Sequence, residues 1–113
     1  MQDELKKYLL DISTAIEHIL LFIQHVKGLE SYSSNLVIKR AVERELEIIG
    51  EALGNAIKMD EALQISNARK IINTRNKIIH GYDEVDDGVI WSILIRHLPI
   101  LKIEVQKLLN EQE

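Results

Sequence analysis

Apolar side chains recur at steps of three and four residues along nearly the whole of this 113-residue chain. That spacing places them on one side of an α-helix, and no stretch alternates apolar and polar residues for long enough to indicate a strand. Proline, which interrupts helices, occurs once, and glycine occurs five times. The pattern therefore predicts an all-α fold.

The apolar pattern divides into four segments joined by short polar stretches. The expected helices cover residues 3–26, 35–58, 67–80 and 88–110, with a polar connection at 31–35, a loop or short helical turn at 59–66, and an acidic loop at 83–88. Asp86 or Asp87 can cap the last helix. Pro99 lies inside that helix and should kink it, because proline cannot donate a hydrogen bond to Ile95. Short connections predict an up-and-down bundle of four to five helices.

Length and composition limit the class of protein. The chain suits one domain, residues 1–113, and its 46% of hydrophobic residues can supply a core. A formal net charge of −4 argues against a general nucleic-acid coat, so any nucleic-acid site must be local. The absence of cysteine excludes disulfides and thiolate chemistry. Without an apolar run of bilayer length or a signal-peptide pattern, we expect a cytoplasmic protein with no membrane partner.

The segment 67–82 is basic in an otherwise acidic chain. It contains Arg69, Lys70, Arg75 and Lys77 and no acidic residue. A solvated helix face is one interpretation of such a cluster, and a local site for anions is the other.

Arg75 favours the second interpretation, because it falls within a row of apolar residues. That row is made by Ile65, Ala68, Ile72, Ile79 and Tyr82. A guanidinium on such a face needs a counter-charge, since desolvating a lone charge is costly. The counter-charge could be Glu43, Glu45 or Glu47 of the preceding helix, or an anion that enters a cleft.

His80 follows Arg75 by five residues, which on an ideal helix turns its side chain about 140° away. Asn76 and His80 are four apart and share a face. Gly81 lets the chain leave the helix directly after His80, so the ring could swing towards Arg75.

The sequence from Arg75 to His80 resembles the motif of the HEPN superfamily, an arginine, a polar residue, three further residues and a histidine. Extended through Gly81 and Tyr82, it is similar to the signature of HepT-like toxins. The stretch 40–52, and later Trp91 with Leu98-Pro99, are also similar to that family.

This resemblance implies a homodimer in which the motif helices face each other across a cleft. It also implies a metal-independent endoribonuclease that needs no cofactor and acts as the toxin of a toxin–antitoxin pair. Its partner would be a minimal nucleotidyltransferase, an antitoxin that transfers AMP to Tyr82. As an alternative, Tyr82 would be only a packing residue.

Under this hypothesis, RNA is cleaved by attack of its own 2′-OH. His80 would move protons, Arg75 would bind the phosphate, and Asn76 would orient His80. Lys77, Arg40 and Arg44 would support RNA binding, although both arginines could simply pair with Glu43 and Glu47.

Two other hypotheses remain open at this stage. One is a non-catalytic HEPN module that binds a nucleotide or a partner. The other is a helical dimerisation protein with a buried Arg–Glu pair. We do not expect a metal site, because His18 and His25 are seven residues apart on one helix and cannot chelate one ion together.

Overall fold

The computed structural model describes residues 2–81 and 85–111, and the described chain is helical without a strand. The helices are α1 (Asp3–Phe22), α2 (Leu29–Ser33), α3 (Leu36–Met59), α4 (Ala68–His80), α5 (Asp87–Ser92), the π-helical turn η2 (Ile93–His97) and α6 (Leu98–Asn110). The predicted all-α, HEPN-like bundle is therefore confirmed.

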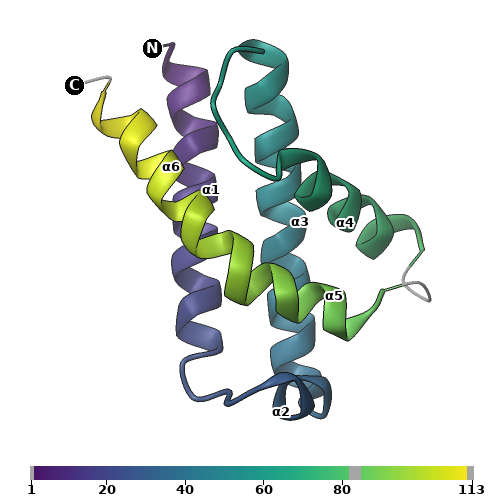
Figure 1. Cartoon of the computed structure of the whole chain (residues 1–113). Helices are drawn as coiled ribbons and strands as arrows, with labels where there is room; N and C mark the ends of the chain where they lie inside the picture. The colour runs from purple at the N-terminus through teal and green to yellow at the C-terminus, as the bar shows by residue number, and fades with distance from the viewer. Residues whose placement is uncertain (1, 82–84, 112–113) are drawn as a thin grey trace.

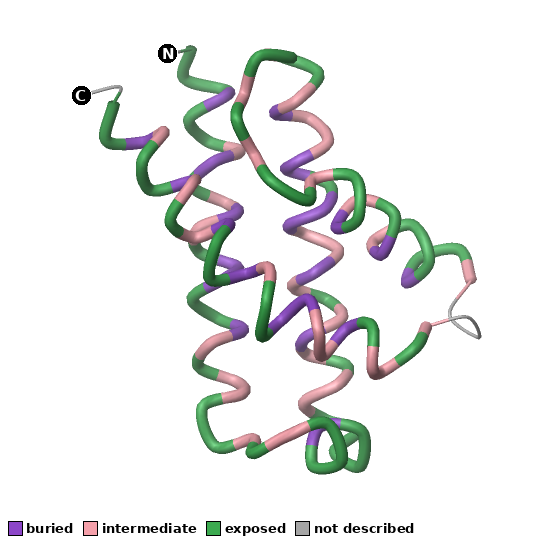
Figure 2. Tube along the Cα trace, viewed as in Figure 1, coloured by how far each residue is buried: buried purple, intermediate pink, exposed green. Residues whose placement is uncertain are grey.

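Three long helices make the core. α1 and α3 pack side by side, and α6 runs across α1, so that α1 begins and α6 ends at the same end of the molecule (Figure 1). The buried side chains of these helices include Leu9, Ile12, Ile16 and Ile19 of α1, Val42, Leu46, Ile49 and Leu53 of α3, and Leu98, Leu101 and Val105 of α6. Figure 2 shows buried positions recurring along each of these three helices. Each such side chain contributes about 1.5–3 kcal/mol through its burial.

The predicted polar connection at 31–35 is wrong, because most of it forms α2. Tyr32 of α2 is fully buried and packs against Trp91 of α5, with the ring centroids 5.5 Å apart. Burial raises the pKa of Tyr32, and the negative charge of Glu43 raises it further. A five-residue helix is too short to show a period in sequence, and this one is held by contacts with residues far along the chain.

The ends of α3 and α4 agree with the prediction to within one residue. Asn35 caps α3 by accepting a hydrogen bond from the backbone N–H of Ile38 at 3.0 Å. Asn67 precedes α4 with φ 59° and ψ 20°, a left-handed conformation that asparagine tolerates better than most residues. By contrast, α1 ends at Phe22, four residues earlier than expected.

The predicted last helix is divided into α5, η2 and α6, and the irregular turn η2 lies just before Pro99, where a kink was expected. Asp86 caps α5, as expected, and accepts from the N–H groups of Gly88 and Val89. The chain then widens into η2, and Pro99 lies in the first turn of α6. A π-helical turn accommodates a residue that lacks an N–H and whose ring would clash with the preceding turn.

α4 projects from this core and packs mainly on α3 (Figure 1). The loop before it is tied to α6, because the carboxylate of Glu104 accepts hydrogen bonds from the backbone N–H and the hydroxyl of Ser66, at 2.8–3.1 Å. No helix in the described ranges has the length and apolar character needed to span a bilayer.

Candidate functional site

The basic residues of α4 form a cluster without acidic partners in the part of the chain described. In the described ranges, no carboxylate oxygen lies within 4.0 Å of the charged nitrogens of Arg69, Lys70, Arg75 or Lys77. Outside α4, ion pairs are made by Lys7, Lys39, Arg40, Arg44, Lys102 and Lys107. α4 is therefore a local source of uncompensated positive charge in a protein of net charge −4.

Arg75 lies at the edge of the helix packing, and not within a buried row as the sequence pattern suggested. The buried face of α4 is made by Ile71, Thr74 and Ile78. The predicted row lies one residue further round the helix, so Ala68, Ile72 and Arg75 are half-buried and Ile79 is exposed. The guanidinium is thus positioned between core and solvent.

The stem of Arg75 rests on the backbone of α3 at Gly50. A Cβ atom at Gly50 would lie 2.7 Å from Cγ of Arg75 and closer still to its Cβ, so only glycine permits this approach. The guanidinium Nη1 donates a hydrogen bond to Oδ1 of Asn76 at 2.9 Å. Its Nε is buried and has no hydrogen-bond partner among the described residues. A buried donor without a partner costs about 1–3 kcal/mol, so this arginine is ready to accept an anion.

A hollow of about 670 Å³ opens beside this guanidinium, between α3 and α4. Its α4 wall includes Arg69, Arg75 and Asn76, and its α3 wall includes Gly50 and Gly54. The sequence left two possibilities for Arg75, an ion pair with a glutamate of α3 or a cleft open to anions. The structure contains the cleft, and none of the three candidate glutamates pairs with Arg75.

His80 does not line this hollow. It is the last residue of α4, it is exposed, and no hydrogen bond joins it to Arg75 in the described chain. Gly81 has φ −147° and ψ 56°, outside the left-handed region, and the possible swing of His80 towards Arg75 is not seen, since no hydrogen bond between the two residues forms in the described chain. One chain by itself holds the two motif side chains apart, as the helix geometry of about 140° requires.

The remaining candidate residues are distributed around α4 and α3. Lys77 lines a second hollow, on the other side of α4 from Arg75. Arg40 and Arg44 pair with Glu43 and Glu47 at 2.9 and 3.0 Å, the alternative that the sequence left open. Tyr82, the expected modification site, lies outside the described residues.

His97, which sequence analysis did not select, is half-buried and lies near this basic helix. Burial lowers its pKa, and the positive charges of Lys70 and Arg96 lower it further. Its Nδ1 is buried without a hydrogen-bond partner in the part of the chain described. No sequence signal marks it, because its environment is created where η2 passes α4.

His18 also finds a local partner, since its Nδ1 lies 2.7 Å from a carboxylate oxygen of Glu45. Within the described ranges, no three histidine, cysteine, aspartate or glutamate residues are grouped so that they could hold a metal ion.

A helical bundle whose fourth helix carries Arg75 and Asn76 and ends on His80 is of the HEPN class. The family model described as ribonuclease HepT-like matches residues 12–108, so the chain belongs to this family.

Named relatives agree with this assignment. The chain is 34% identical over 105 residues to a "Putative RNase" of Caldanaerobacter subterraneus subsp. tengcongensis, covering 87% of this chain and 94% of that protein. It is 36% identical over 104 residues to the "Probable ribonuclease HepT" of Thermococcus cleftensis, covering 91% and 94%. A "Putative RNase" of Methanocaldococcus jannaschii is 31% identical over 111 residues, covering 97% and 91%. No solved structure matches the chain.

Proposed function

We propose that this protein is a metal-independent endoribonuclease whose site is built on α4. The observation that carries the proposal is the Arg75 guanidinium, which borders an open hollow with a Nε that is buried and unpartnered among the described residues. Glu51 also borders this hollow, but no carboxylate oxygen of the described residues lies within 4.0 Å of the guanidinium. Membership of the HepT-like family and the ribonuclease names of its relatives support the same chemistry.

The chemistry follows from what each side chain can donate or accept. The 2′-oxygen of a ribose attacks the adjacent phosphorus and loses its proton, while the bond from phosphorus to the 5′-oxygen breaks and that oxygen gains a proton. His80 acts as the general acid–base group that moves these protons, and Arg75 stabilises charge on the non-bridging oxygens. The products are a 2′,3′-cyclic phosphate and a 5′-hydroxyl, so DNA, which lacks the 2′-OH, resists cleavage.

A complete site requires a second copy of the chain in this proposal. Within one chain Arg75 borders the hollow and His80 does not. A two-fold dimer with facing α4 helices brings Arg75 of one protomer to His80 of its partner, and it makes two such sites by symmetry. Asn76, which already binds Arg75 and shares a face with His80, then fixes the arginine at this junction.

We further propose that the protein is a toxin, and that a minimal nucleotidyltransferase neutralises it by transferring AMP to Tyr82. Because Tyr82 follows His80 by two residues, the added nucleotide would stand close to the catalytic histidine. Its bulk would obstruct RNA, and its phosphate would offset the positive charge of α4.

The test is cleavage of RNA in excess EDTA by protein shown by mass spectrometry to carry no adduct. Wild type should cut RNA and leave DNA of the same sequence intact. Arg75→Ala should lower the rate by at least about 100-fold, and His80→Ala by about 100- to 10,000-fold. Arg96→Ala and His25→Ala remove the same side chains from exposed positions outside α4 and should leave the rate unchanged.

An unmodified, folded wild type that never cuts RNA would contradict the nuclease. The separation of Arg75 and His80 within one chain would then favour a non-catalytic HEPN module that binds nucleotides. That alternative predicts retained RNA binding that weakens in Arg75→Ala.

A further inference from the structure

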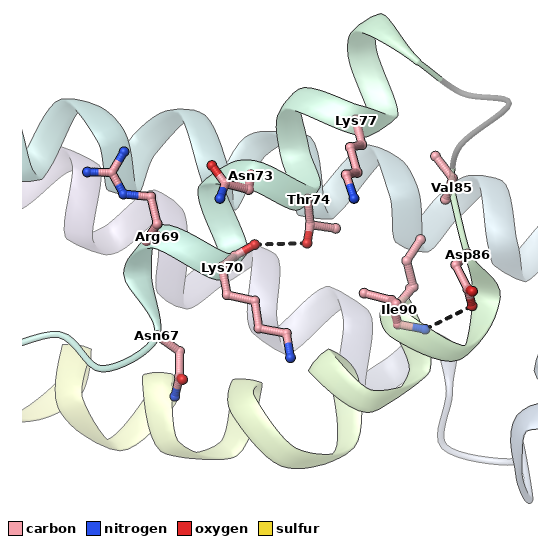
Figure 3. Close-up of a pocket in the computed structure, with 10 residues that line it drawn as sticks. Asn67, Arg69, Lys70, Asn73, Thr74, Lys77, Val85, Asp86 and Ile90 are labelled. Carbon is pink, nitrogen blue, oxygen red and sulfur yellow. Dashed lines mark hydrogen bonds between the residues drawn. The ribbon is translucent and has the colours of Figure 1, made fainter.

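The second hollow lies between α4 and the start of α5 and has a volume of about 550 Å³. That volume falls within the range of about 300–1,000 Å³ common for ligand pockets. Lys70 and Lys77 border it, and in Figure 3 both side chains extend from α4 into the space between the two helices. Arg69 borders both hollows, but its guanidinium points away from the two lysines (Figure 3).

Within the described chain, the positive charges of Lys70 and Lys77 are free to bind an anion. Neither has a carboxylate within 4.0 Å in the part of the chain that the structure describes. The carboxylate that borders the hollow belongs to Asp86, and its Oδ1 accepts from the backbone N–H groups of Gly88 at 2.7 Å and Val89 at 3.2 Å. It is therefore engaged in capping α5.

The opposite wall of this hollow is apolar. It is formed by Val85, Val89 and Ile90; Ile90 is buried, and Val89, which is 44% exposed, offers an accessible apolar surface. Asn67 and Asn73 add amide groups at the rim. A pocket with cations on one wall, an apolar surface on the other and amides between them suits a nucleotide, which has an anionic phosphate and a flat base with polar edges.

We propose that the hollow between α4 and α5 binds an unpaired nucleotide of the RNA strand, beside the cleavage site on the other face of α4. This inference deepens the proposed function and rests on it. Lys70 and Lys77 are seven residues apart, about 10 Å along the helix axis, so each reaches a different phosphate of one strand. The base packs on Val85 and Val89, which requires it to be unstacked, so the substrate is single-stranded at this point.

Binding of an uncleavable strand tests the proposal independently of catalysis. The probe is a fluorescein-labelled single-stranded RNA with 2′-O-methyl groups throughout, which cannot undergo attack by a 2′-OH. Fluorescence anisotropy gives its Kd over a series of salt concentrations. The double variant Lys70→Gln/Lys77→Gln is compared with Lys6→Gln/Lys27→Gln, which removes two exposed lysines of α1 and the following loop that also have no ion pair among the described residues.

We expect the control pair to bind like wild type. The α4 pair should bind roughly tenfold more weakly, and the slope of log K against log salt should become shallower by about 1.4, since each phosphate contact on a single strand contributes about 0.7. Val89→Ser should lower the affinity about two- to fivefold without changing the slope, because it removes apolar contact and no charge. Unchanged affinity and slope in the α4 pair would overturn the proposed subsite.

This experiment separates the two proposals. Cleavage that depends on Arg75 and His80, together with unchanged binding by the α4 pair, would remove the subsite and leave the nuclease. The expected loss of binding in a protein that never cleaves RNA would leave the subsite and remove the nuclease.

Discussion

The surroundings of Arg75 favour a role in binding a ligand over a role in stabilising the fold. Its Nε is buried without a partner, and the only side-chain hydrogen bond that it makes in the described chain is to its neighbour Asn76. In a protein that used this arginine structurally, a carboxylate of α3 would complete the interaction. The cost of leaving the donor unpaired is explained if an RNA phosphate occupies the site during function.

The substitution Arg75→Met separates these roles. Methionine fills the same space on Gly50 without a buried donor, so the free energy of unfolding should stay equal or rise by up to about 1 kcal/mol. Urea unfolding at neutral pH measures that change, and RNA cleavage should be abolished in the same preparation. A loss of several kcal/mol would instead reveal a buried ion pair, as the dimerisation-protein hypothesis requires.

Gly50 is predicted to position Arg75. In Gly50→Ala the new Cβ meets the Cβ and Cγ of Arg75, which are too near the backbone to move aside, so α4 must shift away from α3. We expect a loss of about 1–3 kcal/mol in unfolding free energy, together with slower RNA cleavage.

Gly54→Ala is the matched control, because it lies one turn further along the same wall and its Cβ would meet nothing within 4 Å. It should stabilise the protein by about 0.5–1 kcal/mol through helix propensity and slow cleavage far less than Gly50→Ala does. Equal effects of the two substitutions would contradict a specific role for Gly50.

The phase of α4 shows what sequence can and cannot determine about this site. Its isoleucines come in neighbouring pairs, at 71–72 and at 78–79, so two adjacent rows fit the apolar pattern equally well. The structure buries the first isoleucine of each pair together with Thr74. The hydroxyl of Thr74 donates a hydrogen bond to the backbone carbonyl of Lys70 at 2.8 Å. The motif and the helix end could be predicted, whereas the half-exposed position of Arg75 depended on how α4 meets α3.

At the scale of elements, long periodic helices could be predicted and short ones could not. α3 and α4 begin and end within one residue of the predicted bounds, because their apolar periods are long and Gly81 marks the end of α4. α2 could not be predicted, since it is stabilised by Tyr32 against Trp91 of α5. The hollow between α4 and α5 could not be predicted from sequence either, because its walls come from two helices whose packing the sequence does not specify.

The junction of α2, α3 and α5 depends on Asp87. Its carboxylate accepts a hydrogen bond from the hydroxyl of Ser33 at 2.6 Å and pairs with Lys39 at 2.9 Å. Burial raises the pKa of Asp87, but the bonds from Ser33 and Lys39 outweigh that effect and the net pKa is lowered. Because α5 forms one wall of the proposed nucleotide pocket, this junction also positions that wall.

Asp87→Asn should therefore lower the free energy of unfolding by about 1–2 kcal/mol at neutral pH. A lowered folded-state pKa stabilises the fold above the ordinary carboxyl pKa of 3.8, and this stability is lost as the pH falls through the folded value. The difference between wild type and variant should thus be full at pH 7 and shrink below about pH 4. Urea titrations from pH 7 to 3 measure it, with Glu30→Gln as an exposed control. A difference that grows on acidification would contradict this account.

For the whole molecule, the position of α4 raises the question of whether the protein pairs with a second copy of itself. The outer face of α4 is exposed along its length (Figure 2), and it carries Asn73, Asn76 and His80. If these faces meet in a dimer, light scattering should give twice the chain mass of 13.0 kDa at micromolar concentration. A monomer under those conditions would contradict the dimer.

Mixing two inactive variants tests whether the site is shared. In a heterodimer of Arg75→Ala and His80→Ala, one composite site lacks both groups, while the other keeps Arg75 from one protomer and His80 from its partner. Random exchange makes half of the dimers mixed, each with one of two sites intact, so an equimolar mixture should recover about a quarter of wild-type activity. The double variant Arg75→Ala/His80→Ala mixed with wild type is the control, since its heterodimers contain no complete composite site. If both groups acted within a single chain, the two single variants would stay inactive together, whereas the control mixture would keep one working site in every heterodimer.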